Sequence, residues 1–218
     1  MHRAAFVTIG QSPRDDLVPE MRSWIGEGLD IVERGLLDGM TRKQIESGKA
    51  RGRQSRLVTR VRDGSEIVLG KPWVRDRLRE LLMELEAEPF RFVVLLCTGR
   101  FPGLRSRQLL LEAQAIVDQG AAAICREAGS VGILVPLPEQ RKEVRYSPGP
   151  GQRLMVTYAS PYRPGRLEQA AKELSGAEIV LMDCMGYSEA MRRVVAEVTR
   201  RPVLLARRLV ASAVAQLI

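Results

Sequence analysis

Short apolar runs alternate with amphipathic stretches along nearly all of this chain of 218 residues. Each run is rich in branched side chains and too short for a membrane helix, which is typical of a buried parallel strand. The stretches between the runs have the spacing of helices that bury one face. The predicted strands cover residues 4–9, 29–34, 92–97, 131–136, 154–159, 178–184 and 203–206. This alternation predicts an α/β fold with parallel sheets and helices on both faces.

One segment departs from the alternation. Residues 57–62 and 66–69 flank Asp63-Gly64, a dipeptide that favours a tight hairpin turn. The order of strand, helix and cysteine-ending strand occurs twice, which predicts two lobes. The first lobe covers residues 1–128 with the hairpin inserted, the second covers 129–206, and a helix at 207–218 is expected to pack back on the first.

Three local assignments complete the predicted fold. Residues 10–16 are expected to form a turn that opens the first helix, with Pro13 at the first helical position and Asp15 and Asp16 near its positive end. Residues 107–115 are compatible with a strand or a helix. Thr41 is expected to cap a short helix.

Composition limits the kinds of site. The three cysteines, Cys97, Cys125 and Cys184, form no CxxC pair, so we expect free thiols in a reducing cytosol. His2 is the only histidine, which excludes Ser-His-Asp and Cys-His catalytic arrangements and gives no support for a metal site. We therefore expect no metal.

The chain is basic, with a formal net charge of +8. Its arginines are scattered, and the few aromatic residues do not alternate with them, so we do not expect nucleic-acid binding. Residues 1–16 carry charges directly after a short apolar stretch, which predicts no signal peptide. No apolar run approaches the roughly 18 residues of a membrane helix. We expect a cytoplasmic protein with no membrane partner.

The runs 92–97 and 178–184 each end on a cysteine that a glycine-bearing turn follows. Ligands of open α/β sheets bind just beyond the carboxyl ends of strands. Two thiols at equivalent places in two similar lobes could face each other across a cleft and transfer protons on opposite faces of one small carbon acid. The alternative is that each cysteine is a small buried apolar residue, as we expect for Cys125. Strand alternation predicts that Asp183 points away from Cys184.

The chemistry of such a pair is demanding. Removing a proton from carbon beside a carboxylate needs a strong base and a stabilised carbanion. A thiol has an ordinary pKa of about 8.5, which nearby backbone amides can lower. A catalytic pair is therefore expected to include at least one thiol with a lowered pKa. One thiolate would take the proton and the opposite thiol would deliver one, or a single cysteine would attack an activated double bond.

Other candidates lie in the turns. Ser12 and Arg14 could bind a substrate carboxylate, Arg14 as a bidentate partner, or else Ser12 caps a helix and Arg14 is solvated. Thr98 and Gly99 could present backbone amides to an anion, or only form a tight turn. Tyr187 could donate a hydrogen bond to a ligand, or pack at the rim of the sheet.

Several motifs resemble those of the AroM family. They are Thr8-Ile9-Gly10-Gln11-Ser12-Pro13-Arg14, Leu95-Leu96-Cys97-Thr98-Gly99, Gly132-Ile133-Leu134-Val135-Pro136, Asp183-Cys184-Met185-Gly186-Tyr187 and Pro202-Val203-Leu204-Leu205. That family resembles a branch of the aspartate/glutamate racemase superfamily, which includes hydantoin racemases and maleate isomerase. The resemblance implies two pseudo-symmetric α/β lobes, a cleft with one cysteine from each lobe, and no cofactor. By analogy with the superfamily it also implies a homodimer.

The motifs differ from those of glutamate racemases. Asp-Ser after the first strand is replaced by Gln11-Ser12, Cys-Asn-Thr by Cys97-Thr98-Gly99, and Cys-Thr-His by Cys184-Met185-Gly186. The replaced Asn and His would otherwise bind the carboxylate and assist the base.

These patterns predict an α/β protein that acts on a small carboxylate by cysteine acid–base chemistry without a cofactor, as a racemase, epimerase or isomerase. The alternative is a protein that binds a small anion in the same cleft without catalysis. The expected catalytic residues are Cys97 and Cys184. The expected substrate-binding residues are Gln11, Ser12, Arg14, Thr98, Gly99, Pro136, Met185, Gly186 and Tyr187.

Overall fold

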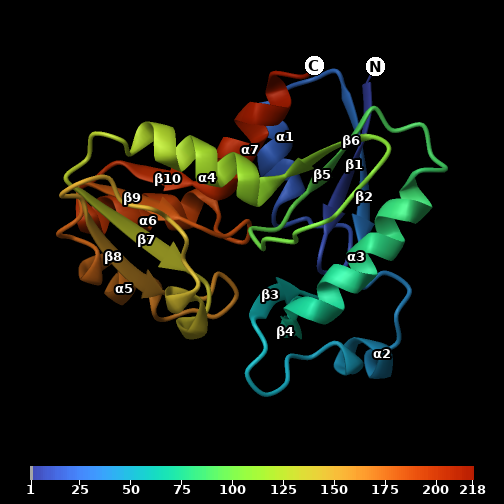
Figure 1. Cartoon of the computed structure of the whole chain (residues 1–218), viewed down its shortest axis with the longest axis horizontal. Coiled ribbons are helices and arrows are strands. Elements are labelled where there is room, and N and C mark those ends of the chain that lie inside the picture. Colours follow the sequence, from blue (N-terminus) through green and yellow to red (C-terminus); the bar gives the residue numbers. More distant parts are fainter. Residues whose placement is uncertain (1) are drawn as a thin grey trace.

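The computed structural model describes residues 2–218, which form two parallel four-stranded sheets (Figure 1). The first sheet has the order β2-β1-β5-β6. Its strands are β1 (His2–Thr8), β2 (Leu29–Gly35), β5 (Phe92–Leu95) and β6 (Leu109–Glu112). The second has the order β8-β7-β9-β10. Its strands are β7 (Ser130–Val135), β8 (Arg153–Tyr158), β9 (Ile179–Met182) and β10 (Val203–Leu205).

The two sheets share one topology. In each, the first strand in the chain is central, the second lies at one edge, the third pairs with the other side of the first, and the fourth forms the other edge. Cys97 and Cys184 each lie two residues beyond the third strand of their sheet. The prediction of two pseudo-symmetric α/β lobes is therefore confirmed, and the two cysteines occupy equivalent places.

Helices cover both faces of each sheet. They are α1 (Val18–Ile25), α2 (Arg42–Ser47), α3 (Lys71–Leu85), α4 (Ala113–Ile124), the 3₁₀ helix η1 (Pro138–Lys142), α5 (Leu167–Glu173), α6 (Glu189–Thr199) and α7 (Ala206–Ala215). Among residues 2–218, none of them has the length and apolar character needed to cross a membrane.

A shared core joins the lobes. One apolar cluster combines a face of each sheet with α1, α4 and α7, and it includes Phe6, Val117, Ile133 and Val210. The opposite face of the first sheet packs on α3, and that of the second sheet on α5 and α6. Helix α7 packs against α1 and α4 of the first lobe. The boundary near residue 129 stays a prediction.

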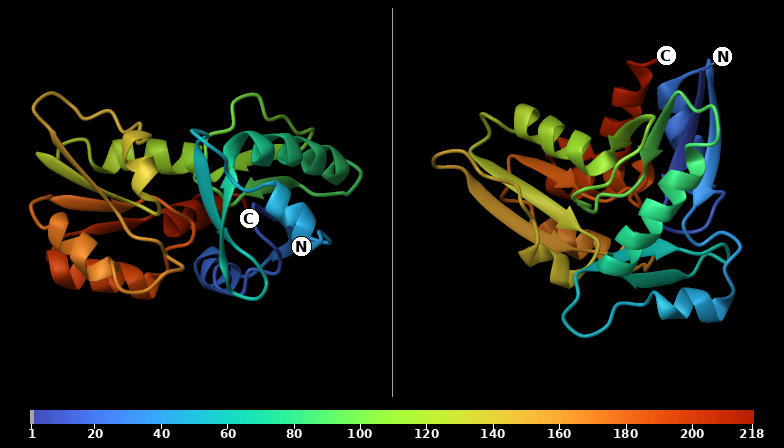
Figure 2. Two further views of the ribbon diagram at one scale, coloured as in Figure 1. Left: turned by 90° about the horizontal axis from the view of Figure 1, so that it is seen from below. Right: turned by 45° about the vertical axis from the view of Figure 1, so that its right-hand side comes forward.

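A hairpin of β3 (Arg56–Arg60) and β4 (Glu66–Gly70) lies between β2 and β5 in the chain, as the Asp63-Gly64 turn predicts. Figure 2 shows it on the side of the first lobe that faces the second. Glu66 pairs with Arg163 at 2.8 Å and accepts a hydrogen bond from Ser160. The hairpin therefore joins the two lobes through polar contacts.

Three local expectations can be compared with the structure. Thr41 caps α2, because its Oγ1 accepts from the Gln44 amide and the Gln44 side chain accepts from the Thr41 amide. Residues 109–112 form strand β6, which α4 follows directly. The expected helix start at Pro13 is wrong, because α1 begins at Val18. The side chain of Ser12 bonds to Asp38 instead of capping a helix.

Candidate active site

Cys97 and Cys184 line one small cavity, called the thiol cavity below, of about 30 Å³. Cys97 is 7% exposed and Cys184 is 8% exposed. A cavity of this size has room for about one or two water molecules. Cys125 lies apart from them, in the apolar core at the end of α4, as predicted. Among the described residues, no three His, Cys, Asp or Glu side chains are grouped to hold a metal ion.

The loops that carry the thiols have the same local geometry. The Gly99 amide donates to Cys97 Sγ at 3.3 Å, and the Gly186 amide donates to Cys184 Sγ at 3.4 Å. Thr98 Oγ1 donates to the Asp183 carbonyl at 3.4 Å and so connects the two loops. Successive backbone amides beside a cavity are suited to bind an anion. In each loop, however, the amide of the glycine already donates to the sulfur.

Burial dominates the ionisation of both thiols. It raises the pKa of Cys97 to about 12 and that of Cys184 to about 11, although the Gly99 and Gly186 amides act in the opposite direction. The amides predicted from the sequence are present, but neither thiol has the lowered pKa that a catalytic pair is expected to show. With these pKa values, both thiols carry their protons at neutral pH.

Arg14 lines the thiol cavity and is buried, so the alternative of a solvated side chain is wrong. Its Nε and Nη2 donate to the two oxygens of Asp16, each at 2.8 Å. Nη1 donates to Thr8 Oγ1 at 2.9 Å, and Nη2 also donates to the Tyr162 hydroxyl at 3.0 Å. Since Asp16 already occupies the bidentate edge of the guanidinium, Arg14 can offer a ligand only its second Nη1 hydrogen.

Most of the predicted binding residues surround the thiol cavity. Those that line it are Arg14, Thr98, Gly99, Pro136, Met185 and Gly186. The other three predicted residues, Gln11, Ser12 and Tyr187, do not line the cavity. The Gln11 side chain accepts from the Arg62 amide at 2.8 Å, and the Ser12 amide donates to Asp38 at 2.8 Å. The roles of all these residues in binding stay predictions.

Tyr187 is fully buried, and its hydroxyl donates to the Ala159 carbonyl at 2.6 Å. It belongs to the apolar cluster between the second sheet, α5 and α6. This is the packing alternative considered for Tyr187 from the sequence, and its hydroxyl already has a partner within the protein.

Several residues that line the thiol cavity were missed from the sequence, among them Tyr162 and Thr59. Tyr162 lines the cavity, and burial raises the pKa of its hydroxyl. Thr59 comes from the hairpin, and its buried Oγ1 has no partner within residues 2–218. Tyr162 follows β8, so the rule that ligands bind beyond strand ends could have found it. No local signal places Thr59 beside the thiols.

A larger pocket of about 640 Å³, called the basic pocket below, adjoins the thiol cavity and shares Leu57, Thr98, Gly99 and Gln140 with it. Its cationic lining residues are Lys71, Arg100, Lys142 and Arg145. Its lining also contains two buried acceptors without partners in the described chain, Asp183 Oδ1 and Gln140 Oε1. The Gln140 amide orientation is set by the bond from Nε2 to the Arg56 carbonyl at 2.8 Å. The lining therefore combines positive charge with the carboxyl of Glu143 and two open acceptors.

Asp183 faces the basic pocket, whereas Cys184 faces the thiol cavity, as strand alternation predicts. Burial, with repulsion from Asp118, raises the pKa of Asp183 to about 7, although Arg100 opposes the shift. The carboxyl is therefore poised to change charge near neutral pH.

Asp183→Asn is expected to raise the free energy of unfolding by about 4 kcal/mol above pH 7 and to leave it unchanged below about pH 4. The folded carboxyl binds its proton more tightly than the unfolded one, so wild-type stability falls as pH rises between these values. Urea denaturation of both proteins across this pH range measures the difference. An equal gain in the free energy of unfolding at every pH would contradict the raised pKa of Asp183.

The family model described as AroM protein matches residues 4–218 of this chain. Comparison with curated protein sequences gives no match. Three similar solved structures share low sequence identity but nearly full length. Allantoin racemase from Klebsiella pneumoniae has a TM-score of 0.59 and 13% identity, over 100% of this chain and 87% of that one.

The aspartate racemase of Picrophilus torridus has a TM-score of 0.60 and 10% identity, over 99% of this chain and 94% of that one. The maleate cis-trans isomerase of Nocardia farcinica, bound to TRIS, has a TM-score of 0.60 and 15% identity, over 99% of this chain and 92% of that one. At these identities the similarity establishes a shared two-lobed fold.

Proposed function

This chain belongs to the AroM family, and from that premise we propose that it is an enzyme that moves protons to and from carbon in a small carboxylate, without a cofactor. Racemases, epimerases and isomerases perform such reactions. The observation that carries the proposal is the placement of two thiols, from equivalent loops of two lobes, around one buried cavity. Two racemases and an isomerase among the similar structures support the same reaction class.

In the proposed reaction the substrate carboxylate is held by backbone amides of the two thiol loops other than those of Gly99 and Gly186, which donate to the sulfurs. The carbon atom then lies between the two sulfurs. One thiolate takes the proton from carbon and becomes a thiol, and the opposite thiol gives its proton to the other face and becomes a thiolate. The product differs from the substrate in configuration, and the two sulfurs have exchanged protonation states.

Substrate entry requires motion, because the thiol cavity of about 30 Å³ is too small for an amino acid or a dicarboxylate. The hairpin covers it through Leu57, Val58 and Thr59. Displacing the hairpin would break the pair between Glu66 and Arg163. The basic pocket then supports a substrate whose far end is anionic and donates hydrogen bonds.

Deuterium exchange tests the proposal. The protein is incubated in D₂O with amino acids, hydroxy acids, dicarboxylates and hydantoins, and NMR follows loss of the carbon-bound proton. Cys97→Ser and Cys184→Ser are each expected to slow exchange at least about 100-fold. Because the pKa of each thiol is raised, exchange by the wild type is expected to increase as pH rises above neutral.

Cys125→Ala is the matched control, because it removes the thiol that lies in the core. It is expected to keep the wild-type exchange rate. Exchange that survives both serine substitutions would exclude the two thiols as the acid and base.

A second candidate is a protein that binds a small anion in this cleft without catalysis. The raised pKa values of both thiols favour it, because neither sulfur is a base at neutral pH. Binding of an anion by folded protein, with no exchange across the panel, would support this alternative.

A further inference from the structure

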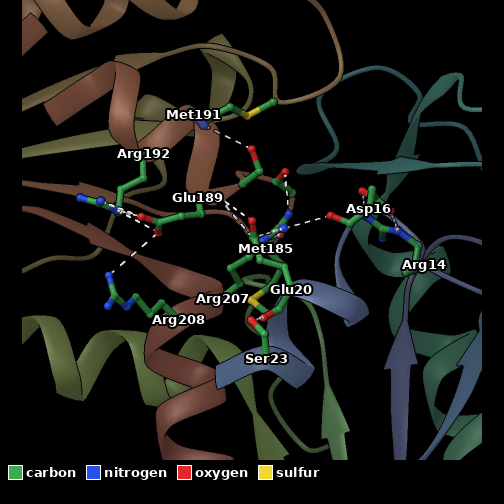
Figure 3. Close-up of polar contacts among 12 residues, drawn as sticks. Arg14, Asp16, Glu20, Ser23, Met185, Glu189, Met191, Arg192, Arg207 and Arg208 are labelled. Carbon is green, nitrogen blue, oxygen red and sulfur yellow. Dashed lines mark hydrogen bonds and ion pairs between the residues drawn. The ribbon is translucent and has the colours of Figure 1, made fainter. Parts of the chain in front are cut away.

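Arg207, in the first turn of α7, is fully buried and connects α7 to both lobes (Figure 3). Its Nε donates to the Met185 carbonyl and its Nη2 to the Gly186 carbonyl, each at 3.0 Å. Its Nη1 donates to the Asp16 carbonyl at 2.9 Å and to Glu20 at 2.6 Å. A buried guanidinium therefore holds the loop that follows Cys184.

One peptide unit links this guanidinium to the sulfur of Cys184. The Met185 carbonyl accepts from Arg207, and the N–H of the same peptide, on Gly186, donates to Cys184 Sγ. In a trans peptide the C=O and N–H groups point in opposite directions, so the cation and the sulfur lie at opposite ends of one dipole. Hydrogen bonds in series polarise one another, which makes this N–H a stronger donor to a thiolate.

The loop after Cys97 has no equivalent cation. Within the part of the chain that the structure describes, no side chain donates to the carbonyls of Thr98 or Gly99. The positive charge acting on Cys97 is that of Lys71. Burial raises the pKa of Cys97 to about 12 and that of Cys184 only to about 11, where Arg14 and Arg207 both oppose the shift.

Glu20 limits the effect of Arg207. Its carboxylate pairs with Arg207 and also accepts from the amide of Glu189, at 3.1 and 3.2 Å. Removing its charge would leave more of the positive charge of Arg207 unopposed. The other titratable groups that act on Cys184 or are acted on by it are Arg14, Cys97, Tyr162, Asp183 and Tyr187.

We propose that Arg207 is a positioning residue that makes Cys184 the first of the two thiols to lose its proton. Cys184 is then the base that takes the proton from carbon, and Cys97 is the acid that delivers one to the opposite face. The assignment of base and acid rests on the proposed function, whereas the order of ionisation does not.

The order of ionisation is measured in variants that keep a single thiol. Cys184 is isolated by Cys97→Ser with Cys125→Ala, and Cys97 by Cys184→Ser with Cys125→Ala. The rate of alkylation by iodoacetamide between about pH 7 and pH 9 reports the thiolate fraction of each sulfur. Arg207→Gln is expected to slow alkylation of Cys184 about tenfold, and Glu20→Gln is expected to accelerate it several-fold.

Arg208→Gln is the matched control, because Arg208 is the exposed neighbour of Arg207 and its substitution makes the same change of charge. It is expected to leave both rates unchanged, and Arg207→Lys is expected to restore part of the rate. The rate of Cys97 is expected to stay the same in every variant. A purely structural role would make Arg207→Gln loosen the Cys184 loop and accelerate alkylation of Cys184, or leave its rate unchanged, and either result would overturn the proposal.

Two further features keep the test decisive. Where Arg207→Gln does not fold, the acceleration by Glu20→Gln and the rate of Arg207→Lys still decide the proposal. Alkylation uses no substrate, so a protein that fails to exchange deuterium can still show the predicted order of ionisation. The two proposals can therefore fail separately.

Discussion

Arg207→Met is expected to lower the free energy of unfolding by about 3–5 kcal/mol. The substitution leaves the carboxylate of Glu20 without its cation, and three carbonyl groups lose their donor. Methionine fills part of the space but donates no hydrogen bond. Leaving buried acceptors without partners is the costly part of such a change. Urea denaturation followed by circular dichroism measures the loss.

The control for this experiment is Arg208→Met on the same helix. Arg208 is 55% exposed, and its ion pair with Glu189 is long at 4.0 Å. Its substitution is expected to change the free energy of unfolding by less than about 0.5 kcal/mol. Equal losses in the two variants would show that the buried network of Arg207 contributes no more than an exposed charge.

Gly10→Ala is expected to lower the free energy of unfolding by about 3 kcal/mol and to displace the hairpin. An added Cβ would collide with the Arg60 carbonyl oxygen and would lie 2.5 Å from Thr59 Oγ1. The backbone cannot easily retreat, because the same Arg60 carbonyl accepts from the Gln11 amide at 3.3 Å. Thermal unfolding measures the loss, and faster alkylation of Cys97 reports the displaced hairpin.

Gly149→Ala provides the comparison, because a Cβ at Gly149 meets nothing within 4 Å. We expect it to be neutral or slightly stabilising. If Gly10→Ala were as well tolerated, the close approach of the hairpin to the end of β1 would not be needed for the fold.

Local sequence patterns predict the parts of this fold that depend on local interactions. Strands such as 92–95 and 179–182 are short branched runs, and the hairpin turn is set by Asp63-Gly64. The position of the hairpin over the cavity depends on contacts such as that between Glu66 and Arg163, which lie far apart in the chain. No periodicity encodes such a contact.

Dependence on contacts between distant parts of the chain also explains the predictions about the site that were wrong. Pro13, Asp15 and Asp16 resemble a helix start, but the helix begins only at Val18, and Asp16 pairs with the buried Arg14. The amides beside both thiols were predictable from the glycine-bearing turns. The degree of burial that reverses the direction of the thiol pKa shifts was not, because it depends on how the two lobes and the hairpin close together.

The contacts of Arg207 can form only after almost the whole chain has been synthesised. Glu20 and Arg207 are 187 residues apart in the chain, so the ribosome makes both cysteine loops before the arginine that holds one of them. Segments that emerge early begin to fold before later ones exist. Until α7 has emerged, the Cys184 loop of the nascent chain lacks its buried cation. The contacts that hold the Cys184 loop are therefore completed late, after both sheets have been translated.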